Sequence, residues 1–208
     1  MASRTFDEAR RWAAEGTALV RAGAAGLTDA DLRAPSTLPG WSVGNLVAHV
    51  AANGDALVNL VTWAKTGIEN PMYAGPSDRA DGIAKGDTLS AAEALAWLDR
   101  SITALDIAMD GLTDEEWTHE VVTAQGRTVP ATEIPWMRTR EVMVHAVDLA
   151  RAVSFADLPT EFCEALIADI LTKRGELTLP EGSPQDLAAW LAGRPHGLTD
   201  APELGPWL

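Results

Sequence analysis

The chain of 208 residues contains one cysteine, Cys163. A single cysteine cannot form an intramolecular disulfide, and it excludes a zinc site built from several thiolates. No apolar run approaches the roughly 20 residues that a transmembrane helix requires. The opening segment MASRTFDEARRWAAEG is charged and amphipathic, without the continuous apolar stretch of a secretory signal. We therefore expect a cytoplasmic protein that has no membrane partner.

Positive charge is also scarce, because 16 Lys and Arg stand against 30 Asp and Glu, a net charge of −14. This balance argues against nucleic acid or an anionic membrane surface as a partner. It does not exclude a small anionic substrate, since a local cluster of arginines can outweigh the overall field at short range. With 47% hydrophobic and 22% charged residues, the composition is that of a globular protein with a sizeable core.

Four stretches show the apolar periodicity of long helices. Three of them begin after a hydroxyl residue that can cap a helix: Thr5, Ser42 and Ser90. In the third stretch the apolar residues recur at nearly heptad spacing, which is typical of a bundle core. The pattern predicts a mainly α fold, a four-helix bundle. The predicted helices cover residues 6 to about 23, 43 to about 65, 91–110 and 134–153.

Two connectors of this bundle are distinctive. Residues 121–129, VVTAQGRTV, have strand-forming residues around Gln125 and Gly126 and predict a short β-hairpin before the fourth helix. Residues 70–87 are rich in Gly, Pro and Asp and predict a long irregular loop. Such a loop is either a binding loop or a flexible surface connection.

We divide the chain into the bundle, residues 1–153, and a small C-terminal appendage, residues 154–208. In the appendage, a helix begins at Thr160 and ends at Gly175, a typical C-cap residue. The segment ELTLP, residues 176–180, then predicts one brief strand, and a short helix follows. The appendage is therefore expected to be a small α/β unit.

The fourth helix carries Glu141 and His145 one turn apart on its apolar face, where Cβ atoms are about 5–6 Å apart. A carboxylate and an imidazole at that separation can bind one divalent metal. His49, in the second helix, is the candidate third ligand. Two histidines and one carboxylate form a catalytic zinc set that leaves a position open for water or substrate. The alternative is that all three are ordinary polar residues, since single histidines and Glu–His pairs are common on helices.

Several neighbours have two interpretations each. Asp148 either orients the ring of His145 as a hydrogen-bond acceptor or pairs with Arg151 across one turn. Asn45 and Asn53, one turn on either side of the third candidate ligand, either support the site or are solvated polar residues.

No internal nucleophile is apparent. Cys163 has no base near it in sequence and is better explained as a small core residue. An open metal position would then activate either water, which implies hydrolysis, or an external thiol, which would add to an electrophile. Arg79, Arg138 and Arg140 are candidates for anion contact, with solvent-exposed faces as the alternative.

Four motifs in this order resemble the mycothiol-dependent maleylpyruvate isomerase family, within the DinB-like group of metal-binding four-helix bundles. They are LPGWSVGNLVAHVA, RTREVMVHAVDL, DLAAWLAGR and PELGPWL. The resemblance spans nearly the whole chain. It implies that His49, Glu141 and His145 bind zinc or another divalent metal. It also implies that Arg194, in LAGR, is a catalytic arginine that grips a substrate carboxylate through two hydrogen bonds.

In such enzymes mycothiol adds to the cis double bond of maleylpyruvate, and rotation followed by thiol elimination gives fumarylpyruvate. The resemblance therefore predicts a zinc- and mycothiol-dependent isomerase of a small anionic electrophile in aromatic-acid breakdown. Asn53 and Arg79 are the candidates for cofactor contact. One alternative is a mycothiol S-transferase that conjugates the thiol to an electrophile. The other is a metal-binding bundle without turnover.

The C-terminal part departs from the usual pattern of the family. The family usually has a small α/β domain with several strands there, whereas residues 175–185 leave room for one short strand. We therefore expect a shortened appendage, and the placement of Arg194 depends on how it packs. We expect a monomer, with a dimer as the alternative.

Overall fold

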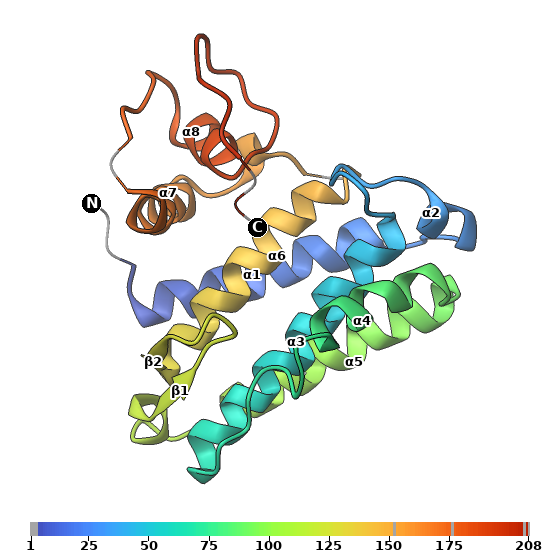
Figure 1. Cartoon of the computed structure of the whole chain (residues 1–208), viewed down its shortest axis with the longest axis vertical. Helices are drawn as coiled ribbons and strands as arrows, with labels where there is room; N and C mark the ends of the chain where they lie inside the picture. The colour runs from blue at the N-terminus through green and yellow to red at the C-terminus, as the bar shows by residue number, and fades with distance from the viewer. Residues whose placement is uncertain (1–3, 152, 176, 206, 208) are drawn as a thin grey trace.

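Figure 1 shows the computed structural model, which describes residues 4–151, 153–175, 177–205 and 207. Its four long helices are α1 (Phe6–Ala24), α3 (Val43–Thr66), α5 (Ala91–Asp110) and α6 (Ile134–Asp148). Helix α1 packs most extensively on α6, α3 packs on α5, and α3 also contacts α6. The predicted mainly helical bundle is confirmed, and α3 and α6, which carry the candidate ligands, face each other inside it.

The first three long helices begin where the sequence predicts, because a side-chain hydroxyl caps each of them. The Oγ atoms of Thr5, Ser42 and Ser90 accept hydrogen bonds of 3.0–3.3 Å from the backbone N–H three residues later. In each case a side-chain oxygen of that later residue accepts a hydrogen bond from the cap residue's own backbone N–H. These reciprocal bonds satisfy N–H groups that the first helical turn leaves unpaired.

Helix α6 ends at Asp148, five residues before the predicted end at residue 153. The backbone of Ala150 turns into the left-handed region, with φ of 54°, and breaks the helix. The Asp148 carbonyl instead accepts a hydrogen bond of 3.1 Å from the Thr37 hydroxyl. The end of the helix is thus fixed by a contact from a distant segment, and it places His145 in the last turn.

Residues 70–87 do not form the predicted irregular loop throughout, since they contain α4 (Asp78–Ala84) and the 3-10 helix η1 (Lys85–Asp87). This segment is fastened to the first turn of α3. The backbones of Gly44 and Gly86 lie in close contact. A Cβ atom at either position would lie only 2.2–2.4 Å from the carbonyl oxygen of the other residue, so no side chain fits there. The Asn45 amide donates to the Ile83 carbonyl, 3.0 Å away. Asn45 therefore supports the fold, and these tertiary contacts stabilise helices in a Gly- and Asp-rich stretch.

The predicted hairpin is confirmed as strands β1 (Glu120–Val122) and β2 (Thr128–Pro130), which pair antiparallel with Val121 opposite Val129. Gly126, with φ of 76°, supplies the left-handed residue that the tight connection needs. Four short helical segments complete the bundle part and its exit: α2 (Asp29–Arg33), η2 (Glu116–Thr118), η3 (Ala131–Glu133) and η4 (Phe155–Asp157).

The appendage contains α7 (Thr160–Arg174) and α8 (Pro184–Leu191). The strand predicted over residues 176–180 is not found at residues 177–180, and Glu176 lies outside the described residues. A strand needs a partner for its backbone groups. Among the described residues, the hairpin of the bundle forms the one sheet. The appendage as described is therefore helical.

The appendage shares its core with the bundle. In Figure 1 helices α1 and α6 lie between α7 and α8 on one side and α3 and α5 on the other. Trp12 of α1, Trp136 of α6 and Phe162 of α7 form an aromatic cluster with ring centroids 6.0–6.3 Å apart. Along the described chain, no helix combines the length and apolarity needed to cross a bilayer.

Candidate metal centre

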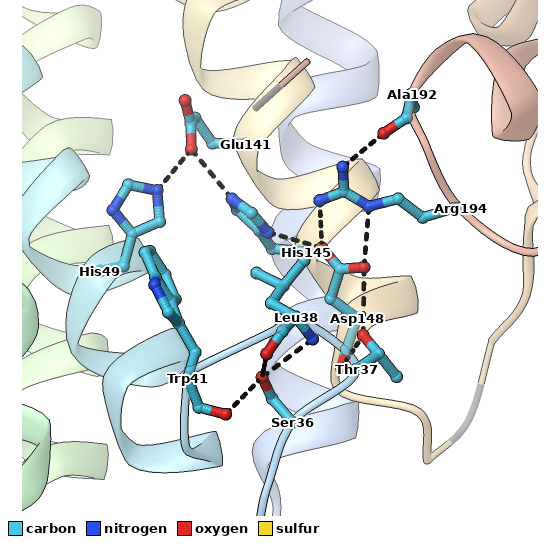
Figure 2. A network of polar contacts seen from close by, with 10 residues as sticks. All are labelled: Ser36, Thr37, Leu38, Trp41, His49, Glu141, His145, Asp148, Ala192 and Arg194. Carbon is cyan, nitrogen blue, oxygen red and sulfur yellow. Dashed lines mark hydrogen bonds and ion pairs between the residues drawn. The ribbon is translucent and has the colours of Figure 1, made fainter. Parts of the chain in front are cut away.

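The three predicted ligands converge between α3 and α6 (Figure 2). One carboxylate oxygen of Glu141 lies 2.9 Å from Nε2 of His49 and 3.3 Å from Nε2 of His145. The three ligand atoms all lie within 4.8 Å of one another. Both histidine side chains are 3% exposed, and that of Glu141 is 16% exposed. The i,i+4 spacing on α6 and the depth of His49 on α3 thus produce one compact cluster.

The protonation states of His49 and Glu141 suit a divalent metal. Burial lowers the pKa of His49, which keeps its imidazole neutral and able to ligate. Burial acts to raise the pKa of Glu141, but hydrogen bonds from both histidines outweigh it and hold that pKa well below its usual value. An ionised carboxylate and imidazole nitrogens are donors that zinc accepts. The residues therefore fit the metal that the sequence predicts.

Asp148 resolves the first open alternative, because it contacts His145 and not Arg151. Its Oδ2 atom accepts from Nδ1 of His145 at 2.8 Å, and the carboxylate is 1% exposed. Arg151 instead lies 3.9 Å from Asp31. A carboxylate on Nδ1 fixes the ring and leaves Nε2 directed at the metal position, a common arrangement for metal-binding histidines. Burial acts to lower the pKa of His145, but the hydrogen bonds to Asp148 and Glu141 raise it overall.

Arg194 extends this chain of contacts. Its Nε and Nη2 atoms donate to the two oxygens of Asp148 at 3.1 and 2.7 Å, and Nη1 donates to the Ala192 carbonyl at 2.6 Å. Figure 2 shows the paired hydrogen bonds to Asp148. The appendage thus brings Arg194 to the site. However, the two guanidinium N–H groups that were expected to bind a substrate carboxylate donate to Asp148 instead. In this arrangement Arg194 supports Asp148, and through it His145.

A cavity of about 440 Å³ opens beside the cluster, bordered by both histidines, Glu141 and Arg194. We call it the Trp41 cavity, because the ring of Trp41 packs edge-on against His49 with centroids 5.3 Å apart. Arg79 borders it, as its predicted role in cofactor contact requires. Leu38 and Leu204 add apolar walls, which raise the strength of electrostatic contacts within.

Asn53, the other residue predicted to contact the cofactor, lies away from the Trp41 cavity. It is 5% exposed, and its side-chain oxygen accepts from Nη1 of Arg138 at 2.9 Å. The same nitrogen of Arg138 donates to the Val50 carbonyl at 2.8 Å. Burial lowers the pKa of Arg138 to about 10, so it stays charged at neutral pH. Both residues tie α6 to α3 beside the ligands, and Arg138 is buried, not on the exposed face considered from the sequence.

Cys163 is confirmed as a core residue. It is fully buried, and burial raises the pKa of its thiol to about 12. A thiol that remains protonated and has no access to solvent is not a nucleophile. The chain itself therefore offers no thiolate to the Trp41 cavity.

Sequence reasoning missed three contributors. Thr37 donates to a carboxylate oxygen of Asp148 at 3.3 Å, and Trp41 covers His49. The pairing of Asp148 with Arg194 spans 46 residues, and no local pattern indicates it. A tryptophan directly before a capped helix with a buried histidine was the available signal for Trp41.

The similarity to known proteins extends over nearly the whole chain. The family model described as mycothiol maleylpyruvate isomerase N-terminal domain matches residues 12–150. A crystal structure of a mycothiol-dependent maleylpyruvate isomerase is similar, with 35% identity, a TM-score of 0.91 and 98% of each chain covered. A variant of that enzyme with one histidine replaced by alanine gives 34% identity, the same TM-score and the same coverage. A search of curated protein sequences finds no significant match.

The extent of this match bears on the appendage. Because 98% of each compared chain is covered, the appendage is not shortened relative to these two structures.

Proposed function

The chain belongs to the mycothiol-dependent maleylpyruvate isomerase family, and from this premise we propose that it isomerises maleylpyruvate to fumarylpyruvate with zinc and mycothiol. As a member of an isomerase family it is an enzyme. The observation that carries the proposal is the pairing of two features. A cluster of His49, Glu141 and His145 opens onto a cavity, while the chain's only cysteine is buried and inert.

In this proposal the three clustered side chains hold the metal. When bound, the metal supplies positive charge that lowers the pKa of a thiol in the adjacent cavity. The external thiol supplies the nucleophile whose reversible addition turns the cis double bond into a single bond, about which rotation is free. Cys163 cannot provide this nucleophile, which explains why the reaction requires a thiol from outside.

The remaining residues have positioning roles. Asp148 holds Nδ1 of His145, so that Nε2 stays directed at the metal position. Arg194 neutralises the buried Asp148 carboxylate and keeps it ionised, because burial alone would raise the pKa of Asp148. Arg79, at the wall of the Trp41 cavity, is placed to contact the thiol cofactor. Trp41 shields the cluster from water on the side of His49.

The test is an assay of the purified, zinc-loaded protein with maleylpyruvate and mycothiol. We expect fumarylpyruvate to form while the concentration of free thiol stays constant, because elimination regenerates the thiol. No turnover under these conditions contradicts the proposal. Loss of one thiol per electrophile consumed would instead identify the chain as a mycothiol S-transferase, the alternative with the same site.

A further inference from the structure

A second cavity, of about 530 Å³, lies on the other side of Glu141. Glu141 borders both cavities, and Figure 2 shows its second carboxylate oxygen pointing away from the two histidines. The walls of the second cavity come from the hairpin, α6, α7 and Trp207. We call it the basic cavity, after the four cationic residues that border it: Arg127, Arg140, Lys173 and Arg174. Of the three candidate ligands, Glu141 borders both cavities, whereas His49 and His145 border the Trp41 cavity.

Four cations around one cavity are unusual in a chain that has 16 in all and a net charge of −14. Glu133 and Asp169, which also border the cavity, are already paired. Glu133 binds Arg4, and Asp169 binds Arg140 at 2.8 Å and Lys173 at 3.0 Å.

Two of the cations have capacity left for a ligand. The side chain of Arg127 is exposed and forms no hydrogen bond or ion pair with any described residue. That of Arg174 donates to the Gly205 carbonyl, a neutral acceptor. Positive charge without a partner therefore remains at this cavity.

The cavity also has a surplus of hydrogen-bond donors. Three side chains that border it have a buried N–H without an acceptor among the described residues: Trp136 at Nε1, Arg140 at Nε and Arg174 at Nε. Buried donors without partners are costly, and native proteins usually satisfy them. A group with several acceptor oxygens and no donor would satisfy them best. An ionised carboxylate is such a group, whereas a sugar hydroxyl also brings a donor that needs an acceptor of its own.

We propose that the basic cavity binds a carboxylate of the electrophilic substrate, so that electrophile and thiol reach the metal position from opposite sides of Glu141. The identity of the ligand as a dicarboxylate electrophile rests on the proposed function. Arg194, the arginine expected to bind this carboxylate, already donates its paired N–H groups to Asp148. Trp207 forms an aromatic wall of the subsite. Its ring centroid lies 5.8 Å from Cζ of Arg140 and 5.1 Å from Nζ of Lys173.

The experiment titrates the zinc-loaded protein with maleate, a small cis-dicarboxylate, by isothermal titration calorimetry without thiol. The double variant Arg127→Gln/Arg174→Gln removes the two cations that have capacity left and should bind maleate at least about tenfold more weakly, because charge-assisted hydrogen bonds are among the stronger ones. Arg11→Gln/Arg100→Gln removes two exposed cations elsewhere and should bind like the parent. Arg127→Lys should retain most of the affinity, and the uncharged diamide of maleic acid should not bind.

Two results overturn this proposal. One is a maleate affinity of Arg127→Gln/Arg174→Gln that equals the parent's, or no detectable maleate binding by the parent. The other is weaker maleate binding in Arg79→Gln but not in the double variant, which would place the carboxylate in the Trp41 cavity. Because this titration needs no turnover, an inactive protein that shows the expected binding contradicts only the proposed reaction. An active protein should show a higher KM for the electrophile in the double variant, with the KM for mycothiol unchanged.

Discussion

Single residues set the candidate centre through a chain of contacts that starts at His49 and passes through Glu141, His145 and Asp148 to Arg194. Four of these five side chains are buried, and that of Glu141 is 16% exposed. Local spacing on one helix predicts the pairing of Glu141 with His145 and gives the contact of Asp148 with His145 as one of two alternatives. From the sequence, His49 is only a candidate third ligand on another helix. The link to Arg194 depends on how the appendage docks, which no residue pattern near Asp148 indicates.

Glu141→Gln tests the central premise at this scale. The amide is isosteric but neutral, so it weakens both the metal site and the hydrogen bonds to the histidines. We expect metal affinity to fall by more than the roughly 10–100-fold typical of losing a residue that only orients a ligand. Metal analysis of the purified variant and chelator competition measure this. Unchanged metal content would remove the metal site from the interpretation.

Asp148→Asn tests the support of His145. The substitution keeps the shape but loses the charge that fixes the ring, and we expect metal affinity to fall about 10–100-fold. Chelator competition gives the affinity, and circular dichroism checks that the helices remain. Arg194→Lys should have a smaller effect, since an ammonium keeps the charge but loses the paired geometry. A metal affinity equal to the parent's in Asp148→Asn would mean that Asp148 has no part in the centre.

At the scale of helices, the sequence predicts the starts of the long helices and the ends of α1, α3 and α5, but not the end of α6. A helix start is predictable at Thr5, Ser42 and Ser90, because each hydroxyl can form a capping box with the residue three positions later. The end of α6 depends on Thr37, which is 111 residues away in sequence from Asp148. Helix α4 was missed for the same reason, because contacts with α3 stabilise a stretch whose composition favours turns.

Ser90→Ala should destabilise the protein by about 1 kcal/mol, since it removes an N-cap acceptor and the partner of Glu93. Urea unfolding at neutral pH measures this. Ala92→Ser, on the exposed side of the same turn, is a control that should change the midpoint little. An unchanged midpoint in Ser90→Ala would show that the cap is not formed.

The capping carboxylates also make a pH prediction. Hydrogen bonds from Thr5 and Ser90 lower the pKa values of Glu8 and Glu93 below their ordinary value of 4.5. A carboxylate whose pKa is lower in the folded state stabilises that state above the unfolded pKa, and this contribution is lost as pH falls through the folded pKa. We expect urea midpoints to fall as pH decreases below about 4.5, with a smaller decrease in Glu8→Gln/Glu93→Gln. An equal decrease in that variant would assign the acid sensitivity to other groups.

At the scale of the whole molecule, the boundary proposed at residue 153 separates two units that share an apolar core. Phe162 of the appendage is fully buried against Trp12 and Trp136 of the bundle. Periodicity alone could identify the helices on each side of the boundary but could not show which faces meet. The shared core also explains how Arg194 is held at the centre.

Phe162→Ala tests this shared core. Truncating a buried phenylalanine typically costs about 3–5 kcal/mol, and here the cavity would form between bundle and appendage. We expect one cooperative unfolding transition in differential scanning calorimetry, shifted to lower temperature in the variant. Metal affinity should fall as well, because Arg194 depends on the docking. Two separate transitions in the parent protein would show that the appendage unfolds independently.

The backbone contact between Gly44 and Gly86 has a consequence for how related sequences can vary. A side chain at either position would displace the other segment, since neither carbonyl can yield without moving η1 away from α3. The two positions should therefore change together in evolution. Where one carries a side chain, the segment equivalent to residues 78–87 should differ in length or position, and the wall that Arg79 contributes should differ with it.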